Sequence, residues 1–156
     1  MLFKKRKLRN NKIEENKFKM RRLFSKEIDD SDTYNLILAY STFFNPKIKD
    51  YTYNNLILGY KNDDTLVVME TNKELSDVYS IRVIDKNSFK KASYNLSQEL
   101  FKIYFSNKEC LKFTLIEKNY IDVDLLPLIE QEIEVDEFKD FFFEFRIKPH
   151  IHIKRK

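Results

Sequence analysis

Two histidines near the C-terminus, His150 and His152, are the residues whose spacing would best suit metal chemistry. In an extended segment, side chains two residues apart point to the same face, so both imidazoles would be presented together. A zinc site needs three or four ligands, and the sequence does not place the carboxylates Asp122 and Asp124 beside the pair. We therefore predict no metal site and expect the histidines to be exposed or packed against a strand.

Hydrolysis would require carboxylates with a nearby lysine, or a serine activated by a histidine. Asp122, Asp124, Glu137 and Lys139 occur in a suitable order, but their acidic surroundings would repel a phosphate backbone. No serine lies in the Gly-x-Ser-x-Gly turn of the serine hydrolases. We predict no catalytic residues, and a metal-dependent hydrolase stays a remote alternative.

The chain has one glycine, Gly59, and one cysteine, Cys110. Loops that cradle phosphates and dinucleotides need several glycines, so both nucleotide-binding motifs are excluded and we predict no cofactor. A single cysteine cannot form an intramolecular disulfide, which fits a reducing compartment, and we interpret it as a core or near-core thiol.

No stretch of about 18 apolar residues is present, so we predict no transmembrane segment. The basic start is followed by no apolar core of the kind that a signal peptide has. We therefore expect a cytoplasmic protein.

Basic residues near the N-terminus form the strongest binding feature. They could neutralise phosphates of a nucleic acid, rest on anionic lipid, contact an acidic protein surface, or only make the terminus soluble. Charge alone does not choose among these targets. The candidate polyanion-binding residues are Lys4, Lys5, Arg6, Lys7, Arg9, Lys12, Arg21 and Arg22, with Arg155 near the C-terminus.

The net charge of +4 conceals three electrostatic zones. Residues 1–28 hold 11 basic residues against 3 acidic ones, and residues 146–156 hold 5 basic residues and no acid. The intervening residues 29–145 hold 13 basic and 22 acidic residues. Acids are concentrated in residues 122–144, which we interpret as a solvated face; alternatively, the basic N-terminal segment or a basic partner docks there.

The hydrophobic pattern changes along the chain. Residues 1–12 are polar enough to predict a flexible arm, whereas residues 13–28 have the spacing of a basic amphipathic helix. Residues 34–44 suit either a helix or a strand, and we favour a helix that Asn45-Pro46 ends.

Beyond Pro46 the sequence predicts a six-strand antiparallel meander. Asn and Asp in residues 61–64 favour a tight turn between the first two strands. The strands are expected at residues 51–60, 65–70, 78–84, 89–96, 100–105 and 110–116.

Helical spacing returns near the C-terminus. Residues 125–133 are expected to form a short helix around Pro127, and residues 136–146 a longer one. The longer helix carries an apolar stripe that we expect to pack on the sheet, formed by Phe138, Phe141, Phe142 and Phe145.

A meander over residues 51–116 followed by a Phe-striped helix resembles the bacterial pleckstrin-homology-like domains. Residues 79–86 and 101–107 are similar to the paired central strands of that family. The resemblance implies a bent sheet closed by a C-terminal helix and a binding or scaffolding role. It carries over no functional residue.

Together these observations predict an α+β fold: an antiparallel six- or seven-strand sheet or partly open barrel, packed by the C-terminal Phe-striped helix. A single domain over residues 29–146 would lie between a basic arm or helix at 1–28 and a basic tail at 147–156. We expect a non-catalytic binding or scaffolding protein that makes protein–protein contacts, with the basic arm attached to a polyanion or acidic surface. The alternative is an accessory nucleic-acid-binding protein that uses the arm and the tail, and a peripheral membrane surface is a further candidate target.

Overall fold

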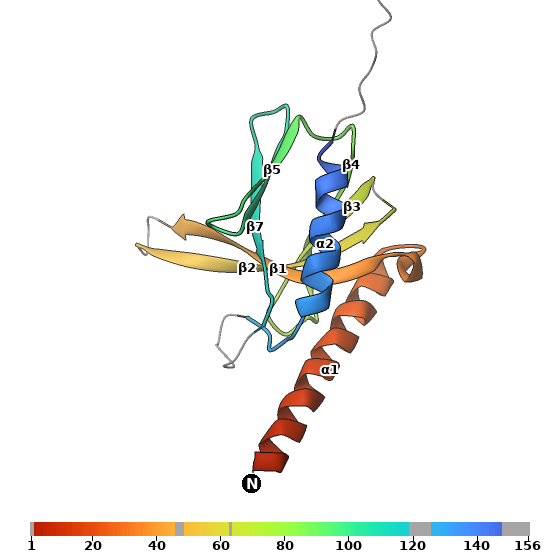
Figure 1. Ribbon diagram of the computed structural model, residues 1–156, viewed down its shortest axis with the longest axis vertical. Helices are drawn as coiled ribbons and strands as arrows, with labels where there is room; N and C mark the ends of the chain where they lie inside the picture. The colour runs from red at the N-terminus through yellow and green to blue at the C-terminus, as the bar shows by residue number, and fades with distance from the viewer. Residues whose placement is uncertain (1, 46–48, 63, 119–125, 148–156) are drawn as a thin grey trace, which may run out of the picture.

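The computed structural model describes residues 2–45, 49–62, 64–118 and 126–147, with side chains from Arg6 onward except at 42–45 and 50–52. It is an α+β fold in which one curled antiparallel sheet lies between two helices (Figure 1). The elements are α1 (Leu2–Glu27), the 3-10 turn η1 (Ser31–Thr33), β1 (Asn35–Asn45), β2 (Asp50–Lys61), β3 (Thr65–Thr71), β4 (Val78–Asp85), β5 (Lys91–Asn95), β6 (Leu100–Tyr104), β7 (Cys110–Leu115) and α2 (Glu132–Phe145).

The seven strands follow the order β4-β3-β2-β1-β7-β6-β5. Two three-strand meanders, β2–β4 and β5–β7, therefore lie on either side of β1. The six expected strands are confirmed, but the single continuous meander is wrong because β4 and β5 form opposite edges.

The connection between β4 and β5 shows why the sheet is curled. A flat seven-strand sheet would separate its edge strands by about 29 Å, at about 4.8 Å per strand. The chain from Asp85 to Lys91 can span only about 21 Å when fully extended. The edges must approach each other, and Arg82 on β4 indeed reaches the β6–β7 turn, where it pairs with Glu109 at 3.2 Å.

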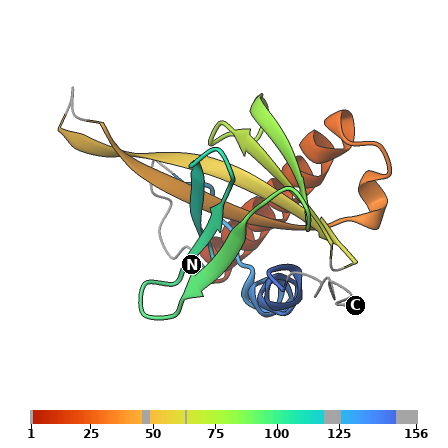
Figure 2. The same ribbon diagram turned by 90° about the horizontal axis from the view of Figure 1, so that it is seen from above.

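Helices α1 and α2 lie on opposite faces of the sheet (Figure 2), and the two faces bury different side chains. On the α2 face, Phe138, Phe142 and Phe145 are fully buried, which confirms the expected Phe-striped helix. On the opposite face, Met20, Leu23 and Phe24 of α1 pack against β1, β2 and β3. The central strands are thus covered on both sides.

This double coverage explains why β1 was expected to be a helix. The helix favoured at residues 34–44 is the strand β1, in which consecutive residues 36–39 are all buried. A strand covered on both faces has a continuous apolar run in place of alternation, and such a run cannot be distinguished from a buried helix by periodicity.

Two further predictions, one for the N-terminal segment and one for the segment before α2, differ from the structure. Helix α1 begins at Leu2, so the segment expected as a flexible arm is helical; it contains no glycine or proline to interrupt it. Residues 126–131 are not helical, in contrast to the short helix expected at 125–133. They form an extended link that lies against α1 and ends at α2.

A buried glutamine fixes this link at the junction between the two meanders. The Gln131 side chain is 1% exposed, and its Oε1 accepts a hydrogen bond from the Leu38 backbone N–H at 2.7 Å. Its Nε2 donates to the backbone oxygens of Leu38 at 3.0 Å and Ile116 at 2.6 Å. The register between β1 and β7 pairs Ala39 with Leu115 and Tyr40 with Thr114, and the Ile116 backbone N–H donates to the Leu38 oxygen at 3.2 Å. The amide therefore bonds to the last backbone groups of this ladder.

The same link holds α1. The buried Asn16 side chain donates to the Leu128 backbone oxygen at 2.7 Å, and Arg9 pairs with Glu130 at 3.1 Å. Lys17 lies 3.8 Å from Glu134 of α2. The basic helix therefore contacts the acidic segment along one side, as the alternative interpretation of those acids expected.

Gly59 permits the close approach of α1 to the sheet. A Cβ atom at this position would lie 2.6 Å from Cε1 of the Phe24 ring and 3.4 Å from Leu36 Cδ2. Phe24 is fully buried, so its ring has little room to move. The single glycine is therefore required by packing.

We expect Gly59→Ala to lower the free energy of unfolding by about 1–3 kcal/mol, because the new methyl overpacks this contact. Phe24→Leu removes the ring atoms that the methyl would meet, so the double variant should be more stable than the sum of the two single effects. Urea denaturation of all four proteins measures this coupling. Strictly additive effects would contradict the proposed clash.

Candidate functional site

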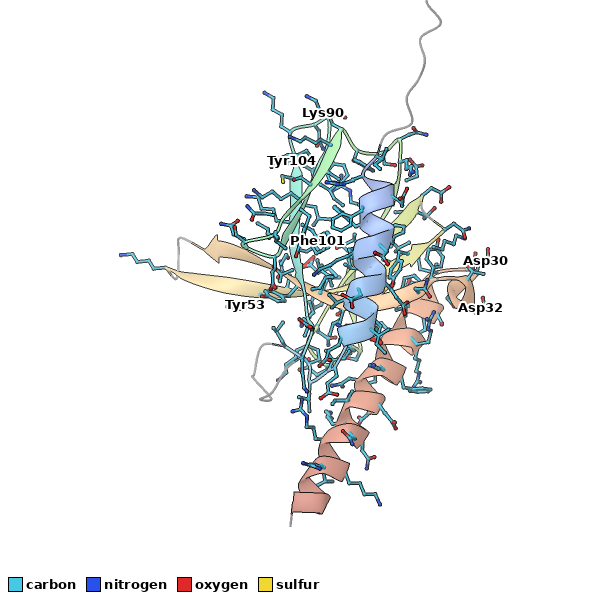
Figure 3. All side chains as sticks on the ribbon, viewed as in Figure 1. Asp30, Asp32, Tyr53, Lys90, Phe101 and Tyr104 are labelled. Atoms are coloured by element: carbon cyan, nitrogen blue, oxygen red, sulfur yellow. The ribbon has the colours of Figure 1, made fainter. Side chains whose placement is uncertain are left out.

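The α2 face of the sheet is filled by aromatic side chains. Phe101 points from β6 into the space beneath α2 (Figure 3), with ring centroids 4.8 Å from Phe142 and 5.4 Å from Phe138. The hollow beside Tyr94 at the edge of this core has a volume of about 30 Å³. That volume suits about one water molecule and excludes a metabolite.

Tyr60 is the polar exception within this aromatic core. It is 3% exposed, its ring packs on Phe138 and Phe141, and its hydroxyl has no hydrogen-bond partner among the residues that the structure describes. Burial raises the pKa of Tyr60 to about 12, and the negative charges of Glu137 and Glu134 act in the same direction. The hydroxyl is therefore neutral at physiological pH and unsuited to act as a base.

We expect the stability of the protein to fall between about pH 10 and pH 12 because of Tyr60. An unfolded tyrosine loses its proton near pH 10, whereas folded Tyr60 keeps it to about pH 12. The contribution of Tyr60 to the free energy of unfolding is complete below about pH 10. It is lost between about pH 10 and pH 12, at about 1.4 kcal/mol per pH unit.

Tyr60→Phe should remove this part of the alkaline loss and should leave stability at pH 7 unchanged or higher, since no hydrogen bond disappears. Burial also raises the pKa of Tyr40, so the relevant quantity is the difference between variant and wild type. Chemical denaturation at pH 7, 10 and 11.5 measures it. Parallel losses in both proteins would contradict the assignment.

The candidate polyanion-binding residues do not share one face of α1. Arg6, Lys7, Lys12 and Arg22 are exposed. Arg9 is engaged with Glu130, and the Arg21 guanidinium donates to the Ser31 backbone oxygen at 2.8 Å, so both help to dock the helix. The side chains of Lys4 and Lys5, and Arg155 as a whole, lie outside the described residues.

One hollow beside α1 brings several basic side chains together. This surface, here named the α1 groove, has a volume of about 310 Å³ and lies between α1 and the β3–β4 loop. It is lined by Lys19, Arg22, Leu23, Lys26, Glu74, Leu75 and Ser76. Glu74 is the single acid among these lining residues, so the groove favours negatively charged ligands.

The loop wall of the α1 groove is held firmly. Asn72 Oδ1 accepts hydrogen bonds from the backbone N–H groups of Ser76 at 2.9 Å and Asp77 at 3.0 Å. Leu75 is 3% exposed and joins the α1-face core, although its φ of 58° lies in the left-handed region. The packing of this side chain offsets the conformational cost of about 1–2 kcal/mol.

Glu15 sets the charge of the neighbouring turn of α1. It pairs with Lys19 at 3.1 Å and with Lys12 at 3.9 Å. The hydrogen bond from Lys19 and the charges of Lys12 and Lys19 lower the pKa of Glu15, which keeps it ionised. Lys19 and Lys12 are thus partly neutralised, whereas Arg22 and Lys26 supply positive charge nearer the C-terminal end of the helix.

Sequence reasoning selected Arg22 but missed Lys19 and Lys26 as lining residues of this groove. Their signal was present, because positions 19, 22 and 26 follow the i, i+3, i+7 spacing of one helical face. The contribution of residues 74–76 could not be foreseen, since it depends on how the loop packs against α1.

The other chemical candidates gain little support from the described residues. Cys110 is half-buried on β7, as a near-core thiol should be. Within the part of the chain that the structure describes, no three His, Cys, Asp or Glu residues gather where they could hold a metal ion. His150, His152, Asp122 and Asp124 lie outside that part.

Neither described helix is both long and apolar enough to cross a bilayer. No protein-family model, curated protein or solved structure matches this chain. The seven-strand curled sheet with its C-terminal helix is consistent with a pleckstrin-homology-like architecture.

Proposed function

We propose that this protein is a non-catalytic binding module that contacts a protein partner through its body and attaches to a polyanionic surface through α1. This proposal rests mainly on one observation: α1 extends from the sheet as a helix whose N-terminal turns bear exposed Arg6 and Lys7 (Figure 1). A helix anchored at Arg9, Asn16 and Lys17 presents these charges in a fixed direction.

Two further features support a role in surface recognition. Aromatic side chains fill the α2 face of the sheet, so little room is left there for a small substrate. The pleckstrin-homology-like architecture is compatible with a scaffolding role, although function is carried by sites and fold alone does not determine it. A cytoplasmic setting belongs to the same proposal.

The attachment can be measured with a fluorescent 20-nucleotide oligo(dT) and with vesicles that contain phosphatidylserine. We expect a variant with Glu at Lys4, Lys5, Arg6 and Lys7 to bind at least tenfold more weakly to whichever polyanion the wild type binds. For the oligonucleotide, the slope of log K against log salt should become shallower by about 3, because each phosphate contact in single strands contributes about 0.7.

The matched control carries Glu at Lys90, Lys91, Lys108 and Lys112, four exposed lysines of the β5–β7 region. Lys90 lies at the end of the molecule opposite the N-terminus of α1 (Figure 3). Equal losses in the two variants would mean that net charge alone acts. That result, or no binding of the wild type to either polyanion, would refute the attachment role of α1.

A further inference from the structure

An apolar strip remains uncovered on the edge strand β4. Tyr79, Ile81 and Val83 are 65%, 39% and 59% exposed. Ile81 pairs with Met69 and Val83 with Val67, and these two partners are fully buried on the α1 face of the sheet. Val78, at the start of β4, still packs against the α1-face core, but the rest of β4 on this face is open to water. We name these three residues the β4 strip.

The uncovered strip is about one helix wide. Helix α1 approaches the sheet over β1 and β2, where Phe24 meets Gly59 and Leu36. Strand β4 lies two strand spacings from β2, which is about 10 Å. Packed helices have their axes about 8–10 Å apart, so a second helix laid beside α1 would cover β4.

The charge beside this strip is complementary to acids. Lys19, Arg22 and Lys26 form one stripe on α1 and line the α1 groove, whose loop wall leads directly into β4. A second helix laid over β4 would run beside the stripe of Lys19, Arg22 and Lys26. Acidic side chains repeated at i, i+3 or i+4, and i+7 would match its spacing.

Building on the proposed function, we propose that the β4 strip and the α1 groove together receive an acidic amphipathic helix from a partner protein. Its apolar side would cover Tyr79, Ile81 and Val83, and its acidic side would face Arg22 and Lys26. This is the helix-in-groove mode of recognition, in which an apolar stripe supplies contact area and flanking charges set orientation.

The test uses a phage-displayed library of random 16-residue peptides, selected on the full chain and then measured by fluorescence anisotropy. We expect enriched peptides to be acidic and to carry apolar residues at helical spacing. Val83→Lys and Arg22→Glu should each weaken their binding at least tenfold. The matched controls Leu96→Lys, at a 77% exposed residue of the β5–β6 turn, and Lys112→Glu, on β7, should not.

Thermal melting of each variant checks that these exposed substitutions leave the fold intact. The inference would be overturned if no peptide is enriched, or if the enriched peptides lack acidic residues and helical apolar spacing. It would also be overturned if neither Val83→Lys nor Arg22→Glu changes the affinity of the peptides. The inference would also be overturned if sedimentation velocity shows a dimer of the wild type and a monomer of Val83→Lys. A second copy of the chain would then occupy the β4 strip.

The two proposals fail separately. Replacing Lys4, Lys5, Arg6 and Lys7 with Glu should leave peptide binding within about twofold, since these positions precede Lys19 by 12 residues or more, which is about 18 Å along the helix axis. Val83→Lys should leave oligonucleotide or vesicle binding unchanged. A wild-type protein that binds the peptides but neither the oligonucleotide nor the vesicles would refute the first proposal alone.

Discussion

The hydrogen bonds of one buried amide, that of Gln131, hold the parts of this molecule in their relative positions. The amide occupies the place where β1 and β7 separate and satisfies backbone groups of Leu38 and Ile116. Left unpaired, the Leu38 N–H and the Ile116 carbonyl would each cost about 1–3 kcal/mol in the core, whereas the Leu38 carbonyl also accepts from the Ile116 N–H. Because Gln131 also precedes α2 and ends the link that binds Asn16, it connects β1, the β5–β7 meander and α2 directly, and α1 through the link.

The two helices give the two faces of the sheet different roles. On the α2 face, phenylalanines fill the curl of the sheet and leave little space for a ligand. On the α1 face, coverage stops one strand short of the edge, and the covering helix carries the basic stripe of Lys19, Arg22 and Lys26. This division is the basis of the proposed recognition at the outer surface.

The elements with regular apolar spacing could be predicted from the sequence, as shown by the Phe stripe of α2 and by the alternation of Tyr79, Ile81 and Val83. That alternation was correctly assigned to a strand, yet the sequence could not show that its apolar side is exposed. Strand β1 was missed because both of its faces are buried, which removes the alternating pattern. The role of Gln131 left no local signal, since its partners at Leu38 and Ile116 are set by tertiary pairing. Likewise, charge counts identified the basic helix, but only packing separates docked Arg9 and Arg21 from exposed Arg22.

We infer that the Gln131 junction holds α1 against the sheet through the link that binds Asn16. Native-state hydrogen exchange of the wild type and of Gln131→Met, which keeps the side-chain length but removes the amide, tests it most directly. We expect β1, β7 and residues 13–24 of α1 to lose protection together, by a similar free energy of about 2–4 kcal/mol. Unchanged protection of α1 beside a loss confined to residues 38 and 116 would contradict the claim.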